Sequence, residues 1–400
     1  QVLVNNAHIL YILSGVEVGG AESYIPLLIS GLKRYQYRIT VLCPAASLFG
    51  SLAAQLQREG ADVLRIPLKH RRDYIVPFIL PSFDVFQITS LVRTLKRLRP
   101  DVVHINQNEP ESEFSTLLAA HLAGMGERVV TTVHISASYQ QVGVPLAKLR
   151  DQWVRWFINR FHFPMIFVSE ASRRMFCRNF GVDPRRISVI YHGLPADPGP
   201  GNSRAWLIEE FKLPETSVIG GAIGRFHKQK GYSYLIRAVR KVAETGRKNI
   251  VVLFIGDGEE RKALEAQIRN SGLQDQVRIT GWRDDVTFIL RGLDFFVLPS
   301  LWEGMPFALL EAMRAGLPAI VSDVDGNREA VIAGETALLV PPADPSRLAD
   351  ALIYLSEHAD MRLRMGAAAR RRFEELFTLD RMGRDTRNLY QEIIRRGNPL

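Results

Sequence analysis

Residues 299–311 read Pro-Ser-Leu-Trp-Glu-Gly-Met-Pro-Phe-Ala-Leu-Leu-Glu, and this stretch decides how the rest of the chain is interpreted. An apolar run at residues 294–298 precedes it and has the length of a buried strand. Helix-forming residues follow from Phe307 to Ala315, with Pro306 at the first helical position, which proline favours, and with Gly316 at the C-terminal cap. The pattern predicts a buried strand that leads through a turn into a helix.

The predicted turn creates a site for an anion. The first backbone N–H groups of a helix lack partners within the helix, and the helix dipole is positive at that end. Glu303 precedes the helix and Glu311 lies one to two turns inside it, so one carboxylate is expected on each side of a bound phosphate. Carboxylates accept hydrogen bonds from paired hydroxyls, which suits a sugar on one side and a ribose on the other. Two glutamates alone would indicate a solvated loop, but their place in this turn favours a binding site.

A basic loop follows the first predicted strand of the second half. Residues 224–231 read Gly-Arg-Phe-His-Lys-Gln-Lys-Gly, and Arg225 and Lys230 are expected at the same strand end as the anion site. A guanidinium and an ammonium together can neutralise a diphosphate. An ordinary basic loop is the alternative interpretation, and the neighbouring turn favours the phosphate.

Both halves of the chain alternate short apolar runs with helical stretches. This alternation predicts an α/β fold with two doubly wound, Rossmann-like domains whose ligand lies in a central cleft at the carboxyl ends of both sheets. A Pro- and Gly-rich linker at residues 195–203 divides residues 1–195 from residues 204–378, and an amphipathic helix is predicted within residues 379–400. The expected strands are residues 7–13, 37–43, 63–67, 102–106, 129–134, 165–169 and 187–191, then 218–223, 250–255, 277–280, 295–298, 319–322 and 338–340.

The glycine-rich turns do not match a nicotinamide-binding domain. The first turn lacks the G-x-G-x-x-G spacing, and the motif that begins at Gly256 has Arg261 in place of its last glycine. Gly19 and Gly20 still allow the backbone to approach a phosphate or sugar closely, although a simple tight turn would also explain them.

Charge and cysteine content restrict the partners and the compartment. The net charge is +9, and residues 1–195 carry 22 Lys and Arg against 14 Asp and Glu, which indicates an anionic partner for the first half. Cys43 and Cys177 are far apart, which favours a reducing compartment and argues against a metal cluster. The first ten residues have no basic segment typical of a signal peptide, and no apolar run is long enough to span a bilayer, so a cytoplasmic location is expected.

These motifs together resemble those of the family 4 retaining glycosyltransferases with the GT-B fold. The resemblance rests on the Gly19-Gly20 pair, on Arg225 with Lys230, and on Glu303-x7-Glu311, and it covers nearly the whole chain. It is most specific over residues 218–342. It implies that the last helix returns to the first domain.

The resemblance also implies a role for individual residues. Arg225 and Lys230 would hold the donor diphosphate and stabilise the departing nucleotide, Glu303 would hold the transferred sugar, and His134 would lie near the reacting sugar carbon. Glu311 would bind the ribose, and Arg283 would lie where the base is recognised, largely through the backbone. The implied donor-binding residues are Gly19, Gly20, Arg283, Gly304, Met305, Pro306, Phe307 and Glu311.

The activity implied by the resemblance is that of a retaining hexosyltransferase. It would move a sugar from a nucleotide-diphosphate sugar, with a UDP-sugar favoured over GDP-mannose, to a hydroxyl of a saccharide or lipid-linked acceptor. Synthesis of cell-envelope polysaccharide, lipopolysaccharide or glycolipid is the expected context. Asp323-Val324-Asp325 matches a metal-binding string, but its place after a strand indicates a polar turn, and neither a metal nor another cofactor is expected.

Two other classes of protein stay open at this point. A non-hydrolysing UDP-sugar epimerase shares the two-domain architecture but needs no acceptor, and a basic binding protein would need no catalysis. Nucleic acid is not an expected partner, because no aromatic and basic recognition motif occurs. A basic run, either a solvated face or a peripheral contact with an anionic membrane, includes Arg173, Arg174, Arg178, Arg185 and Arg186, with residues 70–72 and the aromatic stretch 153–163.

Overall fold

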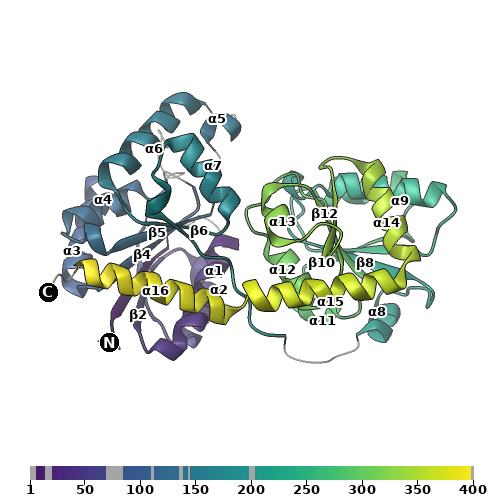
Figure 1. The fold of residues 1–400 in the computed structure, drawn as a ribbon, viewed down its shortest axis with the longest axis horizontal. Coiled ribbons are helices and arrows are strands. Elements are labelled where there is room, and N and C mark those ends of the chain that lie inside the picture. The colour runs from purple at the N-terminus through teal and green to yellow at the C-terminus, as the bar shows by residue number, and fades with distance from the viewer. Residues whose placement is uncertain are drawn as a thin grey trace. The chain divides into compact units, whose positions relative to one another are not determined.

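The computed structural model describes residues 6–13, 20–68, 84–109, 112–134, 138–142, 145–197 and 203–397. The chain divides into two compact units (Figure 1). The first unit contains Gln1–Pro195 and Leu379–Leu400, and the second contains Ala196–Thr378. Each unit is built on one parallel sheet with helices on both faces. The predicted fold class, α/β with two doubly wound sheets, is confirmed.

The sheet of the first unit has seven strands in the order β3-β2-β1-β4-β5-β6-β7. The strands are largely apolar because parallel sheets are covered on both faces. Each of the seven runs predicted in this half forms a strand, although β6 and β7 end two residues earlier than predicted. The strands are β1 (His8–Ile12), β2 (Arg38–Pro44), β3 (Asp62–Ile66), β4 (Val102–Gln107), β5 (Val129–Val133), β6 (Met165–Phe167) and β7 (Ile187–Val189).

The helices of this unit cover the two faces of the sheet according to strand order. The order runs in one direction from β1 to β3 and in the other from β4 to β7, and right-handed crossovers therefore put the two sets of helices on opposite faces. One set consists of α1 (Gly20–Leu32) and α2 (Gly50–Arg58). The other consists of α3 (Val85–Leu98), α4 (Phe114–Leu122), the short α5 (Tyr139–Val142), α6 (Ala147–Phe161) and α7 (Glu170–Phe180).

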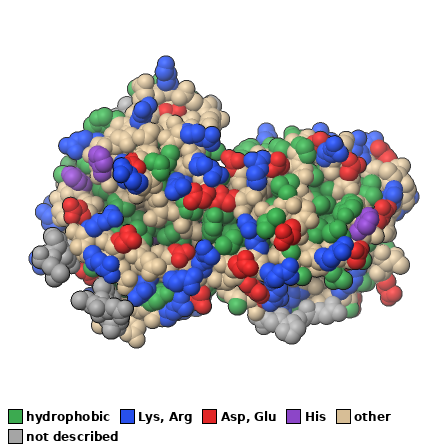
Figure 2. Space-filling model, in the orientation of Figure 1, with side chains coloured by type: hydrophobic (Ala, Val, Ile, Leu, Met, Phe, Trp, Pro, Cys, Tyr) green, Lys and Arg blue, Asp and Glu red, His purple; other side chains and the backbone are tan. Residues whose placement is uncertain are grey.

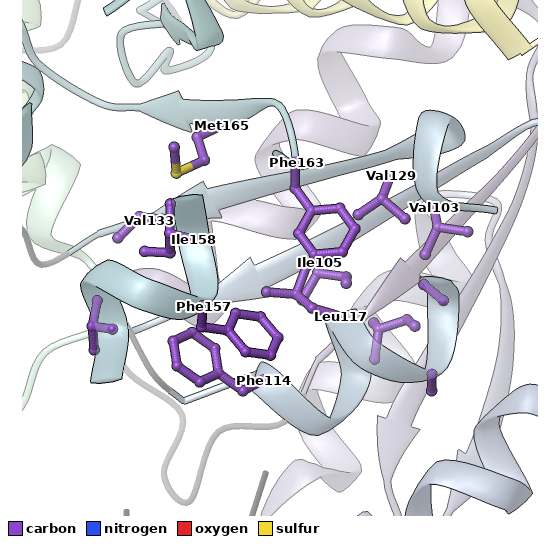
Figure 3. Close-up of a cluster of buried hydrophobic side chains, with 14 of the residues drawn as sticks. Val103, Ile105, Phe114, Leu117, Val129, Val133, Phe157, Ile158, Phe163 and Met165 are labelled. Carbon is purple, nitrogen blue, oxygen red and sulfur yellow. The ribbon is translucent and has the colours of Figure 1, made fainter. Parts of the chain in front are cut away.

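The second set of helices shares a large apolar core with the sheet (Figure 3). Phe114 of α4 stacks on Phe157 of α6 with ring centroids 3.9 Å apart. Val103, Ile105 and Val133 contribute from the strands to the same buried cluster. This packing fixes α4 and α6 on the sheet and therefore fixes the loops that connect them to it.

The last helix, α16 (Leu379–Gly397), packs against α1 in the first unit. At their crossing a Cβ added to Gly383 would lie 2.1 Å from the carbonyl oxygen of Gly31, so the two backbones touch. Tyr390 then anchors α16 in the core, because its hydroxyl lies 2.8 Å from that of Tyr11 and 2.5 Å from Nδ1 of His104. Burial lowers the pKa of His104 to about 3. A neutral imidazole therefore completes this network.

The sheet of the second unit has six strands in the order β10-β9-β8-β11-β12-β13. The strands are β8 (Val218–Ile223), β9 (Ile250–Ile255), β10 (Val277–Gly281), β11 (Phe295–Leu298), β12 (Ala319–Ser322) and β13 (Ala337–Val340). The helices are α8 (Arg204–Glu210), α9 (Tyr232–Glu244), α10 (Arg261–Asn270), α11 (Val286–Leu290), α12 (Phe307–Arg314), α13 (Asp325–Ala330), α14 (Pro345–Glu357) and α15 (Ala359–Leu376). No helix within the described residues is both long and apolar enough to cross a bilayer.

Candidate active site

The loops that follow β8 and β11 lie against each other at the carboxyl edge of the second sheet. The strands are parallel, so their carboxyl ends meet at one edge. The backbone N–H of Leu301 donates to the carbonyl of Gln229 over 2.7 Å, and the Gln229 side chain donates to the carbonyl of Trp302 over 2.9 Å. Gly231 makes the contact possible, because its φ is +67° and a Cβ there would lie 2.1 Å from the Pro299 carbonyl oxygen.

Two further glycines close the neighbouring loops onto the same region. Gly256, after β9, has φ +146°, and a Cβ there would lie 2.1 Å from the Gly224 carbonyl oxygen. Gly326, in α13, approaches the 299–306 loop so closely that a Cβ would lie 2.4 Å from the Gly304 carbonyl oxygen. The loops after β8, β9, β11 and β12 therefore form one tightly packed edge.

An ion pair between Lys230 and Glu303 lies at the centre of this edge. Lys230 ends a short 3₁₀ turn at Lys228–Lys230, and its Nζ lies 2.7 Å from Oε1 of Glu303. The hydroxyl of Ser300 donates to the same oxygen over 2.7 Å. The Lys230 and Glu303 side chains are only 20% and 6% exposed. The structure thus brings together two of the residues expected at the site, with the cation held in place by the carboxylate.

The helix α12 begins directly after this pair. The sequence predicts Pro306 at the first helical position, whereas in the structure Pro306 is the N-cap residue and Phe307 begins the helix. Proline suits the position because it has no N–H of its own to satisfy. Gly316 follows the last turn with φ +74°, as a C-terminal glycine should. The positive end of the α12 dipole therefore lies on the same short loop as Glu303.

Glu311 lies in the second turn of α12 and is largely buried. Burial raises its pKa above the usual value, and the nearby charge of Arg314 opposes that effect. Arg314 is itself buried and donates to the Thr287 hydroxyl over 3.0 Å. Glu311 is therefore a carboxylate with little water around it, which makes a hydrogen-bond donor from a ligand favourable there.

Arg225 and Arg283, two other predicted site residues, have partners that the sequence did not reveal. Arg225 contacts Glu259 on the loop after β9, with Nε and Oε2 3.2 Å apart, and both side chains are exposed. Arg283 holds Asp285 through two nitrogens at 2.8 and 2.6 Å and also reaches Glu210 of α8 at 3.4 Å. The Arg283 side chain is thus engaged with its own loop and with α8.

The Asp323-Val324-Asp325 string forms ion pairs with an arginine. Oδ1 of Asp323 lies 2.7 Å from Nε of Arg328, which lowers the pKa of Asp323, and Asp325 lies 3.8 Å from the same guanidinium. Within the described part of the chain, no group of three or more His, Cys, Asp or Glu side chains is placed to hold a metal ion.

The carboxyl edge of the first sheet carries His134, directly after β5. Its Nε2 lies 2.9 Å from Oδ1 of Asn106 on β4, and Tyr24 of α1 meets its ring edge-on at 5.4 Å. Burial lowers the pKa of His134 to about 4, so the imidazole is neutral near pH 7. Gly19 lies outside the described residues, and Gly20 is the first residue of α1.

The same edge holds carboxylates that the sequence analysis missed. Glu22 is buried in the first turn of α1 and accepts from the Asn108 side chain over 2.8 Å. Glu109 accepts from the Tyr139 hydroxyl over 3.4 Å. Burial also raises the pKa of Glu113, at the start of α4, to about 8. The sequence contains a signal for two of these carboxylates. Glu22 comes soon after the glycine pair, and Glu109 comes soon after a predicted strand, where residues of a binding site are often found.

Family models match both units of the chain. The model described as "Glycosyltransferase Family 4" matches residues 18–197, and the model described as "Glycosyl transferases group 1" matches residues 205–372. Together they cover most of the chain, and the second match contains the Lys230–Glu303 pair and α12.

One curated relative is named for a particular reaction, and another is named for a biosynthetic process. An Escherichia coli UDP-Gal:alpha-D-GlcNAc-diphosphoundecaprenol alpha-1,3-galactosyltransferase is 29% identical over 338 residues, which are 82% of this chain and 86% of the relative. The lipopolysaccharide core biosynthesis glycosyltransferase LpsD of Rhizobium meliloti is 34% identical over 195 residues, which are 48% of this chain and 54% of the relative.

Solved structures show the same fold. Anabaena HepE, solved in complex with UDP, has a TM-score of 0.80 at 19% identity, with 96% of this chain and 100% of HepE covered. A glycosyltransferase from Rickettsia africae has a TM-score of 0.81 at 19% identity, covering 98% of this chain and 99% of the relative. At this level of identity the likeness establishes the fold alone.

Proposed function

Because the chain belongs to the family 4 glycosyltransferases with the GT-B fold, we propose that it is a retaining hexosyltransferase. It moves a sugar from a UDP-sugar to a hydroxyl of a saccharide or lipid-linked acceptor. The reaction belongs to the synthesis of cell-envelope polysaccharide, lipopolysaccharide or glycolipid. Two relatives support this context by their names, one for lipopolysaccharide core synthesis and one for a diphosphoundecaprenol-linked acceptor.

The Lys230–Glu303 pair beside the start of α12 carries the proposal. A donor diphosphate bound there meets the Lys230 ammonium and the positive end of the α12 dipole. As the bond between sugar and phosphate breaks, negative charge grows on the departing diphosphate. A cation already fixed by Glu303, whose carboxylate also accepts from Ser300, stabilises that charge without having to be reoriented.

The remaining donor contacts are proposed for the other predicted residues of this edge. Glu311 accepts hydrogen bonds from the ribose, and the backbone of residues 304–307 binds the sugar and the phosphates. Arg225 adds positive charge from the neighbouring loop once a ligand competes with Glu259 for it. The Arg283 side chain is bound to Asp285 and Glu210, so the base is recognised by the backbone of that loop. No metal or other cofactor takes part in this proposal.

The acceptor is proposed to bind at the carboxyl edge of the first sheet. His134 is neutral there, so it acts as a hydrogen-bonding group beside the reacting sugar and not as a fixed cation. In the retaining reaction the acceptor hydroxyl attacks the sugar from the face that the diphosphate leaves, and the leaving phosphate takes the proton of the hydroxyl. The oxygen of the acceptor forms the new bond to the sugar carbon, and UDP departs with the electrons of the broken bond.

Acceptor-dependent release of UDP tests the proposal. The purified chain is incubated with a panel of UDP- and GDP-sugars, with and without a membrane extract as the source of acceptor, and free nucleotide is measured. The proposal predicts release only when both the correct donor and the extract are present. Conversion of the donor into another nucleotide sugar without any acceptor would instead identify an epimerase. NMR of the product settles the stereochemistry, and an inverted anomeric configuration would refute the retaining mechanism.

A further inference from the structure

The helix α6 in the first unit has a buried face that positions the carboxyl edge of the sheet. Asp151 on that face accepts from the backbone N–H of Tyr139 over 2.7 Å and from that of Gln140 over 3.2 Å. The guanidinium of Arg150 lies 3.8 Å from the centre of the Tyr139 ring. These contacts fix α5, and the Tyr139 hydroxyl reaches Glu109 at the edge. Any force that orients α6 therefore also orients this edge.

The opposite face of α6 exposes an aromatic stripe. Leu149, Trp153, Trp156 and Arg160 follow one another at spacings of four, three and four residues, so they line one side of the helix. Trp156 is 53% exposed and Leu149 is 49% exposed. The two tryptophan rings stack at 5.0 Å with an angle of 20° between their planes. Trp153 is half-buried against the core, and it supports the exposed ring of Trp156. An exposed tryptophan and an exposed leucine on one side of a helix indicate a surface that another phase or molecule covers.

Cations surround this stripe. Lys148, Arg155 and Arg160 are exposed on α6, and Arg174 and Arg178 are exposed on α7. Residues 147–186 carry nine Lys and Arg against three Asp and Glu. The space-filling view shows Lys and Arg gathered over the region of α6 and α7 (Figure 2). The face as a whole is therefore aromatic and strongly positive.

The arginines of α7 also line a hollow. It has a volume of about 350 Å³ and is bounded by Arg173, Arg174, Arg178, Cys177 and Pro184. The helices α6 and α7 pack side by side on the same face of the sheet, so their outer surfaces turn the same way. The Arg155 guanidinium bridges the two helices, since it lies close to Gly181 at the end of α7. The hollow and the stripe thus belong to one continuous surface.

We propose that this outer surface of α6 and α7 docks on an anionic lipid bilayer. Trp156 and Leu149 enter the boundary between headgroups and acyl chains, where amphipathic aromatic rings are stable, and Trp153 supports Trp156 from below. The arginines and Lys148 reach lipid phosphates, and the hollow on α7 receives one headgroup. The charge of the face favours anionic lipid over an apolar protein surface, because an apolar surface would leave the exposed cations of α6 and α7 without anionic groups to contact.

Docking in this way would place the first unit's carboxyl edge relative to the membrane. The edge is held by the buried face of the same helix, through Asp151 and Arg150. A lipid-linked acceptor would then meet the edge in a fixed orientation. This consequence rests on the proposed function, whereas the docking itself does not.

Flotation with vesicles tests the docking without any enzymatic assay. The full chain is mixed with vesicles of phosphatidylcholine alone or of phosphatidylcholine with phosphatidylglycerol, at low and at high salt. We expect binding only to the phosphatidylglycerol vesicles, with a strong decrease at high salt. Trp156→Ser should weaken this binding by about tenfold or more, since a buried tryptophan is worth at least that factor. Trp282→Ser, at a tryptophan of the second unit that is 77% exposed, is the control and should bind as the wild type does.

A second variant separates charge from apolar contact. Arg174→Glu with Arg178→Glu should abolish the preference for phosphatidylglycerol while the thermal unfolding of the protein stays unchanged, because both side chains are exposed. Equal binding to both kinds of vesicle, binding to neither, or equal losses in Trp156→Ser and Trp282→Ser would overturn the proposal. So would concentration-dependent self-association of the wild type that Trp156→Ser abolishes, because it would identify a second copy of the chain as the occupant.

Discussion

The carboxyl edges of the two sheets differ in the charged and polar groups that they present to a ligand. In the second unit a lysine, a buried glutamate and a helix N-terminus share one short loop, and glycines let the surrounding backbones touch. In the first unit the edge is lined by a neutral imidazole, by side-chain amides and by buried carboxylates. The edge of the second unit therefore favours a bound anion, whereas the edge of the first unit favours a ligand that donates hydrogen bonds. The difference fits a charged donor on one sheet and a hydroxyl acceptor on the other.

The two edges also differ in how they are built. The contacts of the second edge join loops through glycine backbones, and one added methyl group would disrupt them. The first edge is held by side chains on elements far apart in sequence, such as His134 with Asn106 and Glu22 with Asn108. A single substitution at a contact glycine should therefore disrupt the edge of the second unit strongly, whereas a single substitution in the first unit should have a smaller effect on its edge.

The largest effect is expected from Lys230→Met. Loss of the fixed cation should reduce turnover by about 100-fold or more, because donors that stabilise developing charge contribute on that scale. The melting temperature should also fall, since Glu303 is 6% exposed and keeps only Ser300 among the partners described above. Steady-state kinetics with the preferred donor, well below the melting temperature, provide the measurement.

The matched control for this variant is Lys228→Met, on the same 3₁₀ turn but with an exposed side chain. It should keep turnover within about twofold of the wild type, as surface substitutions usually do. Equal losses in the two variants would mean that net positive charge, and not the Lys230 position, is what matters.

The next effect in size is expected from Gly231→Ala. The added Cβ would lie 2.1 Å from the Pro299 carbonyl oxygen in a residue with φ +67°, so the two loops must separate. We expect the free energy of unfolding to fall by about 2–3 kcal/mol, from strain and overpacking together. Urea unfolding gives the value. Gly50→Ala, at a helical glycine with φ −61° and nothing within 4 Å, should be neutral or slightly stabilising, and similar losses in both would contradict the proposed close contact.

His134→Gln should change how stability depends on pH in the first unit. Burial holds the pKa of His134 at about 4, below the value of 6.5 expected in the unfolded chain. The folded state therefore binds fewer protons, and stability that is fully present above about pH 6.5 is lost as the pH falls toward 4. Between pH 7 and pH 5 the wild type should lose about 1–2 kcal/mol more than the variant. Parallel stability curves for the two proteins would show that this histidine is not buried in its neutral form.

The smallest effect is expected from Arg225→Ala. The pair with Glu259 is exposed, so the free energy of unfolding should change by less than about 0.5 kcal/mol. Turnover should nevertheless fall, by about tenfold, because a charged contact to the diphosphate is lost. A variant that is less stable but fully active would remove Arg225 from the site and leave it a structural residue of the second edge.

The sequence revealed the second edge because its chemistry is local. Strand, turn and helix around residues 299–311 follow one another directly, and the basic loop at residues 224–231 follows a strand of the same sheet. Strand order then brings the two loops together, since β8 and β11 are neighbours. The position of Pro306 was missed by one residue, because an N-cap proline and a first-turn proline look alike in sequence.

The carboxyl edge of the first unit was predicted less well, because its contacts join residues that are far apart in the sequence. The partner of Glu22 lies 86 residues away at Asn108, and no spacing rule links them. Tyr390 reaches Tyr11 across 379 residues, so the network that anchors α16 could not be seen before the fold was known. The ion pairs of Arg283 with Glu210 and of Arg225 with Glu259 were hidden likewise, because each joins two loops or helices that only tertiary packing brings together.

Calorimetric titration of nucleotides tests most directly whether Lys230 and the start of α12 hold the donor diphosphate. UDP, UMP, GDP and GMP are each titrated into the wild type and into Lys230→Met. We expect the wild type to bind the preferred diphosphate at least about tenfold more tightly than its monophosphate, and we expect this advantage largely to disappear in the variant. A variant that keeps the full preference for the diphosphate would show that the pyrophosphate is held elsewhere.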